Sequence, residues 1–242
     1  MPVAVALFVL LFWEICVHVF QIPMYLLPAP TSIAQALVEN HEVLFSHAMV
    51  TLLEAVLGLL IALVLAVITA ILMDLSKTFR NSIYPHLVVT QTVPVMVLAP
   101  LFSIWLGFGM APKIMIVIFM CYFPITVSFA DGLSQVSQKQ INLLKSFQAS
   151  TFQIYTMVKI PSAVNSLFSG LKVSATYCIG GAIVGEWISS AAGLGYYMLR
   201  VKNGYMLDKV FATVIVVIVL SLLMNACVEA AKRLLCPHGM KK

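Results

Sequence analysis

Long apolar runs separated by short polar breaks make up most of the chain. A helix that spans the hydrocarbon core of a bilayer needs about 20 predominantly apolar residues, and six runs have about this length. They cover residues 3–21, 48–73, 85–106, 112–130, 163–189 and 208–229. Prolines inside the third and fourth runs are compatible with spanning helices, because neighbours in a bundle can satisfy the carbonyls that they free. The pattern predicts an all-α membrane protein, a polytopic bundle of about six transmembrane helices.

Composition agrees with a location in the membrane. Of the 242 residues, 62% are hydrophobic and 10% are charged, whereas a soluble domain is about 45–50% apolar and about 25% charged. The net charge of +5 is small, so we interpret it as a topology signal rather than as a sign of nucleic-acid binding. The five cysteines contain no C-x-x-C pair, which favours packing roles over a redox or metal site. They are Cys16, Cys121, Cys178, Cys227 and Cys236.

Lysine and arginine predict the side that each loop faces, because cytoplasmic loops carry more of both. The 22–47 loop has neither, whereas the 74–84 and 131–162 loops and the C-terminal tail carry several each. Contrary charges stand at Lys113 and in the last outer loop. The balance places both termini and residues 131–162 in the cytoplasm.

This topology organises the chain as one transmembrane domain, residues 1–242. We expect residues 1–47 to hold a first helix, retained rather than cleaved as a signal peptide, and a short outer interfacial helix. In that outer segment, Ser32 and Gln35 have the spacing of a capping box. Residues 48–229 then form the core bundle, with the 131–162 loop inside it.

The 131–162 loop has a pattern of its own. Apolar residues recur at helical spacing before and after the polar step Gln148-Ala149-Ser150. Ser150 with Gln153 has capping-box spacing, and Pro161 suits the first turn of the next spanning helix. The pattern predicts two short cytoplasmic helices joined by a tight bend, each with one apolar face. Those faces pack either on the bundle itself or in a partner; the periodicity leaves both open.

The same loop resembles the cytoplasmic coupling loop of binding-protein-dependent ABC transporter permeases. Asn142-Leu143-Leu144, Gln148 and Ile160-Pro161 keep the family's spacing, although the family has Glu-Ala-Ala at the first of these and Gly at the second. The likeness extends through "PAPTSI", "TVPVMVLAPLFSIWLGFG", "FPITVSFADGLSQV" and "LFSGLKVSATYCIGGAIVGEWISSAAGLGYYM". These stretches are similar to the taurine, sulfonate, nitrate and thiamine-precursor branch. Within that branch, "GAIVGEW" followed by "GLGYYMLR" is most similar to the permeases for aminopyrimidine thiamine precursors.

The resemblance implies the transmembrane domain of a type I ABC importer in a bacterial cell membrane, passing a small polar solute. It implies a second copy of this chain, cytoplasmic ATPase subunits that bind ATP and Mg²⁺, an extracytoplasmic solute-binding protein, and surrounding lipid. The chain itself has no Gly-Lys dipeptide and hence no phosphate-cradling loop, so we expect no cofactor, no metal and no enzyme activity in it. The solute is a thiamine-precursor aminopyrimidine, or alternatively a sulfonate, taurine, nitrate or a riboflavin-like compound.

Two groups of candidate residues follow. We expect apolar side chains of the loop, Phe147, Phe152 and Tyr155, to enter a groove on the ATPase. The full coupling set is Asn142, Lys145, Phe147, Gln148, Ala149, Ser150, Phe152, Tyr155 and Pro161. Polar or kinked positions inside the bundle are candidates for the translocation path, with structural roles as the alternative. They are Gln91, Pro94, Tyr177 and Glu186.

Rival functions lack their own signals. A secondary carrier would usually show two similar halves, and a membrane enzyme would need a clustered acid, base or metal set; the sequence shows neither a convincing repeat nor such a cluster. A secondary carrier would also leave the 131–162 loop unexplained, whereas a membrane scaffold is compatible with the composition. Gly181 and Gly185, four residues apart, predict a close helix contact in the fifth run.

The predicted topology can be tested by cysteine labelling. We expect a Lys145→Cys variant to resist a membrane-impermeant maleimide in intact cells and to react after permeabilisation, because the 131–162 loop faces the cytoplasm. A Leu26→Cys variant in the 22–47 loop is the matched control and should react from outside. Labelling of position 145 in intact cells would contradict the topology.

Overall fold

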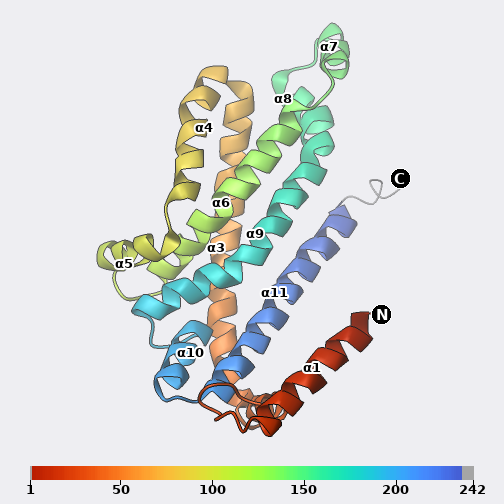
Figure 1. Ribbon diagram of the computed structural model, residues 1–242. Helices are drawn as coiled ribbons and strands as arrows, with labels where there is room; N and C mark the ends of the chain where they lie inside the picture. The colour runs from red at the N-terminus through yellow and green to blue at the C-terminus, as the bar shows by residue number, and fades with distance from the viewer. Residues whose placement is uncertain (1, 236–242) are drawn as a thin grey trace.

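The computed structural model describes residues 2–235, which consist of helices and short connections (Figure 1). Cys236 and the tail lysines Lys241 and Lys242, which contribute to the predicted topology, lie outside the described residues. The helices are α1 (Pro2–Val19), α2 (Pro30–Glu39), α3 (His41–Leu75), α4 (Lys77–Thr92), α5 (Val95–Leu106), α6 (Ala111–Ser134), α7 (Gln138–Ser146), α8 (Thr151–Ile154), the π-helix η1 (Tyr155–Lys159), α9 (Ile160–Ser189), α10 (Leu194–Asn203) and α11 (Leu207–Leu235).

Four helical stretches are long and apolar enough to cross a bilayer. They are α3, α6, α11 and the continuous stretch Thr151–Ser189 that contains α8, η1 and α9. The helix α1 is apolar but shorter. Four of the six predicted spans therefore correspond to single long helices, namely 48–73, 112–130, 163–189 and 208–229.

The predicted single span at 85–106 is wrong in shape. The helix α4 ends at Thr92, α5 begins at Val95, and the two are bent by 102°. Pro94 accounts for the break, because proline has no N–H for the helix ladder and disfavours the helical conformation in the residue before it. Val93 accordingly has extended angles, φ −81° and ψ 120°. The pair forms a broken span or a re-entrant loop.

The centre of the bundle is α6 packed along α9, with α3 against both (Figure 1). Small residues allow this approach. A Cβ added at Gly185 would lie 3.0 Å from the Cα of Lys113, and one at Gly181 would lie 3.5 Å from the Cα of Val117. At Gly58 of α3 an added Cβ would lie 2.5 Å from the Cβ of Val117. The predicted close contact at Gly181 and Gly185 is confirmed.

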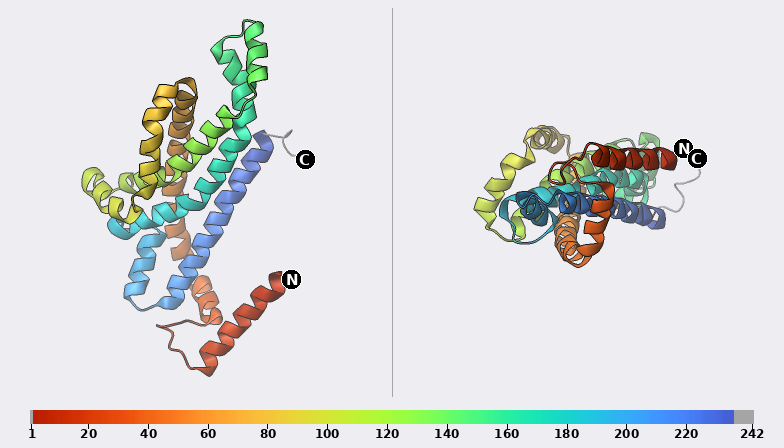
Figure 2. Two further views of the ribbon diagram at one scale, coloured as in Figure 1. Left: turned by 45° about the horizontal axis from the view of Figure 1, so that its top comes forward. Right: turned by 60° about the horizontal axis from the view of Figure 1, so that its bottom comes forward.

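The two ends of the bundle differ. One end holds α7, α8, the α3–α4 junction and the C-terminal end of α11, and the other holds α2 and α10 (Figure 1). The helix α1 lies beside the bundle and contacts it mainly through α2 (Figure 2). The loops with most lysine and arginine thus lie together at one end, as the topology requires; the side that this end faces stays a prediction.

The short helix predicted after the first span is present as α2, but it starts at a different residue, and its location at the outer interface stays a prediction. The helix begins at Pro30 with Ala29 as the preceding residue, and no side chain caps it. Proline is preorganised for the first helical position, so the helix starts before the predicted cap, Ser32. Gln35 donates instead to Glu39 Oε1 at 2.7 Å.

Candidate functional site

The segment between α6 and α9 forms the two short helices and the bend that the sequence predicted. The helix α7 ends at Ser146, and Gln148, two residues further on, has φ 58° in the left-handed region. The N–H of Ala149 donates to the carbonyl of Leu144 at 3.0 Å, and that of Gln148 donates to Lys145 at 2.9 Å. These two bonds form a Schellman motif, which usually has glycine at the left-handed position. Gln148 therefore holds the geometry that the family's glycine would supply, at some cost in backbone strain.

A capping box starts the second short helix, as predicted. The N–H of Gln153 donates to Ser150 Oγ at 3.3 Å, and the N–H of Ser150 donates to Gln153 Oε1 at 2.7 Å. The π-helix η1 follows, and α9 has Pro161 in its first turn, as predicted. Because Pro161 has no N–H, the carbonyl of Met157 lacks its usual α-helical donor, and a π-turn directly before α9 fits this defect.

The aromatic side chains of this segment point in two directions. Phe147 and Phe152 are each 76% exposed. Tyr155 differs from the prediction, because its side chain is buried and its hydroxyl donates to Asp74 at the end of α3. Tyr155 is therefore a contact to the bundle and cannot enter a groove on a partner in this conformation. The exposed coupling candidates also include Asn142, Lys145 and Pro161.

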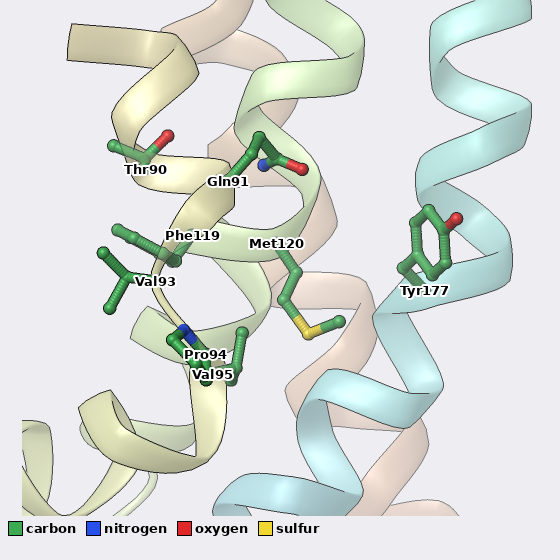
Figure 3. Close-up of a pocket in the computed structure, with 8 residues that line it drawn as sticks. All are labelled: Thr90, Gln91, Val93, Pro94, Val95, Phe119, Met120 and Tyr177. Carbon is green, nitrogen blue, oxygen red and sulfur yellow. The ribbon is translucent and has the colours of Figure 1, made fainter.

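A second feature is a pocket of about 310 Å³ at the break between α4 and α5 (Figure 3). Three of the four predicted path residues, Gln91, Pro94 and Tyr177, line it. Figure 3 shows the Gln91 carboxamide and the Met120 side chain on the side of the pocket that faces Tyr177 on α9. The complete lining is Thr90, Gln91, Val93, Pro94, Val95, Phe119, Met120 and Tyr177.

The chemistry of this lining is uncharged. Gln91 and Tyr177 are exposed polar side chains, whereas Thr90 donates its hydroxyl to the carbonyl of Leu87 at 2.6 Å. The sequence analysis missed Phe119 and Met120, because an apolar run inside a bundle gives no sign of which face lines a cavity. Pro94 was the useful signal, since the break that it causes opens the pocket.

Glu186 does not lie in the pocket. Its carboxylate accepts from Thr51 Oγ1 at 2.6 Å and from the N–H of Gly195 at 2.5 Å, and its side chain is 1% exposed. The N–H of Leu194 donates to Thr51 Oγ1 at 2.8 Å. Glu186 and Thr51 together satisfy N–H groups of the first turn of α10, which otherwise have no partner within that helix. These contacts support the structural alternative for Glu186, and its role in the translocation path stays a prediction.

A buried ion pair lies beside this contact. Lys113 Nζ of α6 is 3.4 Å from Glu54 Oε1 of α3, and both side chains are buried. Lys113 had counted against the predicted topology as a loop charge, but it lies within the bundle. The sequence analysis missed Glu54, although an acid inside an apolar run is a usable signal.

Among the described residues, no group of three or more His, Cys, Asp or Glu side chains could hold a metal ion.

These features define a class of protein: a helical membrane subunit with an uncharged pocket at a broken helix and a short-helix segment protruding from one end. Residues 43–238 match the family described as binding-protein-dependent transport system inner membrane component. The chain belongs to this family and is a permease subunit of an ABC transporter. This assignment favours a transport subunit over the rival carrier, enzyme and scaffold interpretations.

Similar proteins agree with the predicted branch. The chain is 34% identical over 221 residues to a probable ABC transporter permease protein of Haemophilus influenzae, covering 91% of this chain and 90% of the relative. It is 31% identical over 242 residues to the formylaminopyrimidine transport permease protein ThiX of Halalkalibacterium halodurans, covering 100% and 96%. A crystal structure of an amino acid ABC transporter matches with a TM-score of 0.64 at 17% identity, covering 83% of this chain and 96% of that one. The predicted fold class is confirmed.

The structural role of Glu186 leads to a stability prediction. We expect Glu186→Ala to destabilise the purified subunit by about 1–3 kcal/mol, because the N–H of Gly195 and the hydroxyl of Thr51 lose their acceptor in a buried site. Glu186→Gln keeps one acceptor oxygen and should cost less. Thermal unfolding in detergent measures both.

The matched control is Glu42→Ala, which removes an exposed acid from the first turn of α3 and should leave the melting temperature unchanged. An unchanged melting temperature for Glu186→Ala, together with impaired transport, would return Glu186 to the translocation path.

Proposed function

We propose that two copies of this chain form the transmembrane part of a bacterial ATP-driven importer, with the translocation path between them. The carrying observation is the break between α4 and α5 beside an open, uncharged pocket. Non-helical backbone at membrane depth is tolerated only where protein covers it or where it lines a water-filled cavity. Gln91 and Tyr177 are exposed on one copy, so a second copy facing them would close the cavity and keep both side chains from lipid.

The other subunits follow from the family and from what this chain lacks. It has no Gly-Lys dipeptide, so ATP and Mg²⁺ would bind to separate cytoplasmic ATPase subunits. An extracytoplasmic binding protein would deliver the solute to the opposite end, where α2 and α10 lie. Membrane lipid would surround the remaining apolar surface.

The segment α7–α8 is the proposed dock for the ATPase. Phe147 and Phe152 project from two helices that are too short to be stable alone in water. Large exposed aromatic side chains on such a segment favour a partner groove that buries them. Asn142, Lys145 and the bend at Gln148 would supply the polar rim of this contact.

For the solute, the lining favours a neutral molecule that forms hydrogen bonds. Gln91 can donate and accept through its carboxamide, and Tyr177 offers a hydroxyl and a ring face. A thiamine-precursor aminopyrimidine fits this chemistry and agrees with the name of the ThiX relative. A sulfonate or nitrate would bring a negative charge, and the zwitterion taurine a charged sulfonate and ammonium group, to a site whose lining holds no charged side chain.

The ATPase dock predicts the effect of two substitutions. We expect Phe147→Ala and Phe152→Ala each to weaken ATPase association by about 2 kcal/mol or more, the usual cost of truncating a central interface aromatic. Co-purification of the ATPase with each variant measures this. The control is Phe45→Ala, which removes an exposed phenylalanine of α3 far along the chain from the segment.

Gln148→Gly serves as a second control, since glycine adopts the left-handed conformation of this position without strain. It should bind ATPase at least as well as the natural chain. If both phenylalanine variants hold the ATPase normally, the segment is not the dock.

The solute assignment predicts a pattern of competition. Uptake of a labelled aminopyrimidine into proteoliposomes containing the whole importer should fall with excess unlabelled aminopyrimidine, and should not fall with sulfonate, taurine or nitrate. A riboflavin arm distinguishes the other neutral candidate. Gln91→Leu should lower uptake at equal ATPase content, whereas Thr92→Val, one residue outside the lining, should not. Competition by the anions alone would overturn the assignment.

A further inference from the structure

A compact polar cluster joins the protruding segment to the bundle. Asp74 lies in the last turn of α3, and its side chain is 8% exposed. Its Oδ2 atom accepts a hydrogen bond from the Tyr155 hydroxyl and forms an ion pair with Lys159 Nζ. Lys159 Nζ also lies 5.0 Å from the centre of the Tyr155 ring, within range of a cation–π contact. We name Asp74, Tyr155 and Lys159 the Asp74 cluster.

The cluster has a special position in the chain. Tyr155 and Lys159 are the first and last residues of η1, the one π-helical turn among residues 2–235. This turn stands between α8 and the spanning helix α9. Single π-turns inside helices often mark functional positions. Here the wider turn presents a hydroxyl and an ammonium group to one carboxylate on another helix.

Few other contacts connect the segment to α3. The helices α7 and α8 make at most slight contact with the spanning helices, apart from the chain continuity through η1. The segment is continuous with α6 on one side and with α9 on the other, whereas α3 is far away in sequence. A displacement of α7 and α8 can reach α6 and α9 through the backbone, and α3 through the packing of those two helices. The Asp74 cluster adds a direct polar contact between the end of the segment and α3.

The helix α3 leads on to the pocket. Only Ser76 separates it from α4, and the last turn of α4 carries Thr90 and Gln91 of the lining. Movement of the inner end of α3 would therefore shift α4 relative to Tyr177 on α9. The Asp74 cluster therefore lies where displacement of the α7–α8 segment can move α3 and change the distance between α4 and Tyr177 across the pocket.

We propose that the Asp74 cluster transmits ATPase-driven movement of the α7–α8 segment to α3 and α4, and so couples ATP hydrolysis to opening of the pocket. Asp74, Tyr155 and Lys159 act as positioning residues, because none of them touches the solute or the nucleotide. The proposal rests on the proposed function, in which the segment binds the ATPase.

The Asp74–Lys159 ion pair is strong enough to transmit movement between the segment and α3. A buried ion pair strengthened by a second donor resists separation, because parting the charges leaves each uncompensated in a poorly solvated site. Another ion pair at this end, Arg80 with Asp131 at 3.4 Å, has side chains that are 38% and 50% exposed. Solvent screens such a pair, so it is a weak link by comparison.

The test is the number of solute molecules taken up per ATP hydrolysed, measured in proteoliposomes that contain the complete importer. We expect Asp74→Asn to retain the ATPase on purification and to lower this ratio roughly tenfold or more, because the link is broken while the dock is intact. Asp131→Asn is the matched control and should leave the ratio unchanged. The charge-reversed double variant Asp74→Lys/Lys159→Asp should recover a higher ratio than either single substitution.

Two further outcomes keep the proposal separate from a folding defect. Tyr155→Phe removes one hydroxyl and keeps the ring, so it should fold and still lower the ratio; it decides the case if Asp74→Asn does not assemble. A natural ratio in Tyr155→Phe, or in an assembled Asp74→Asn complex, would overturn the proposal and leave the ATPase dock standing. Failure of the proposed function is seen differently, as failure of the natural chain to bind an ATPase at all.

Discussion

The close packing of α6 against α9, with α3 along both, is the constraint on which the rest of the structure depends. Lipid offers no hydrophobic drive for helices to associate, so van der Waals packing and polar contacts must hold a bundle together. Gly185 lets α9 reach the backbone of Lys113, and the next residue, Glu186, is thereby brought to Thr51 of α3. The buried pair of Lys113 and Glu54 lies in the same layer. Small residues and buried charges thus stabilise the same contact region between α3, α6 and α9.

The packing of α3, α6 and α9 also explains where the pocket can form. With α6 and α9 held together, α4 lines the remaining side of α6, and the break at Pro94 turns α5 by 102° away from the direction of α4. The gap at the bend lies between α4, α6 and α9, and residues of all three line it. An unbroken helix through 85–106 would have carried its side chains past this place without opening a cavity. A single proline therefore sets both the shape of the third span and the position of the candidate path.

Sequence reasoning succeeded where the signal was local and failed where it depended on distant contacts. The capping box at Ser150 and the bend at Gln148 are set by neighbours within a few residues, and both are present. The roles of Tyr155 and Glu186 are set by Asp74 and Thr51, which lie 81 and 135 residues away along the chain. Periodicity placed Tyr155 on an apolar face, but it could not show that the face meets a carboxylate. Pro94 was recognised as a kink, but the angle of a broken span depends on the helices around it.

The length of α3 ties the two ends of the molecule together. Its 35 residues correspond to about 50 Å of helix, and no proline interrupts it. In its N-terminal part Thr51 holds the first turn of α10, and in its last turn Asp74 holds Tyr155 and Lys159. The Asp74 contact is to η1, which directly precedes α9, and the Thr51 contact is to α10, which follows α9. Because α3 also packs along α6 and α9 between these two contacts, strain applied at the coupling segment can be shared with the end that contacts α10. The contacts of Thr51 and Asp74 satisfy buried polar groups, and they also connect movement of the coupling segment to the end of the bundle that holds α10.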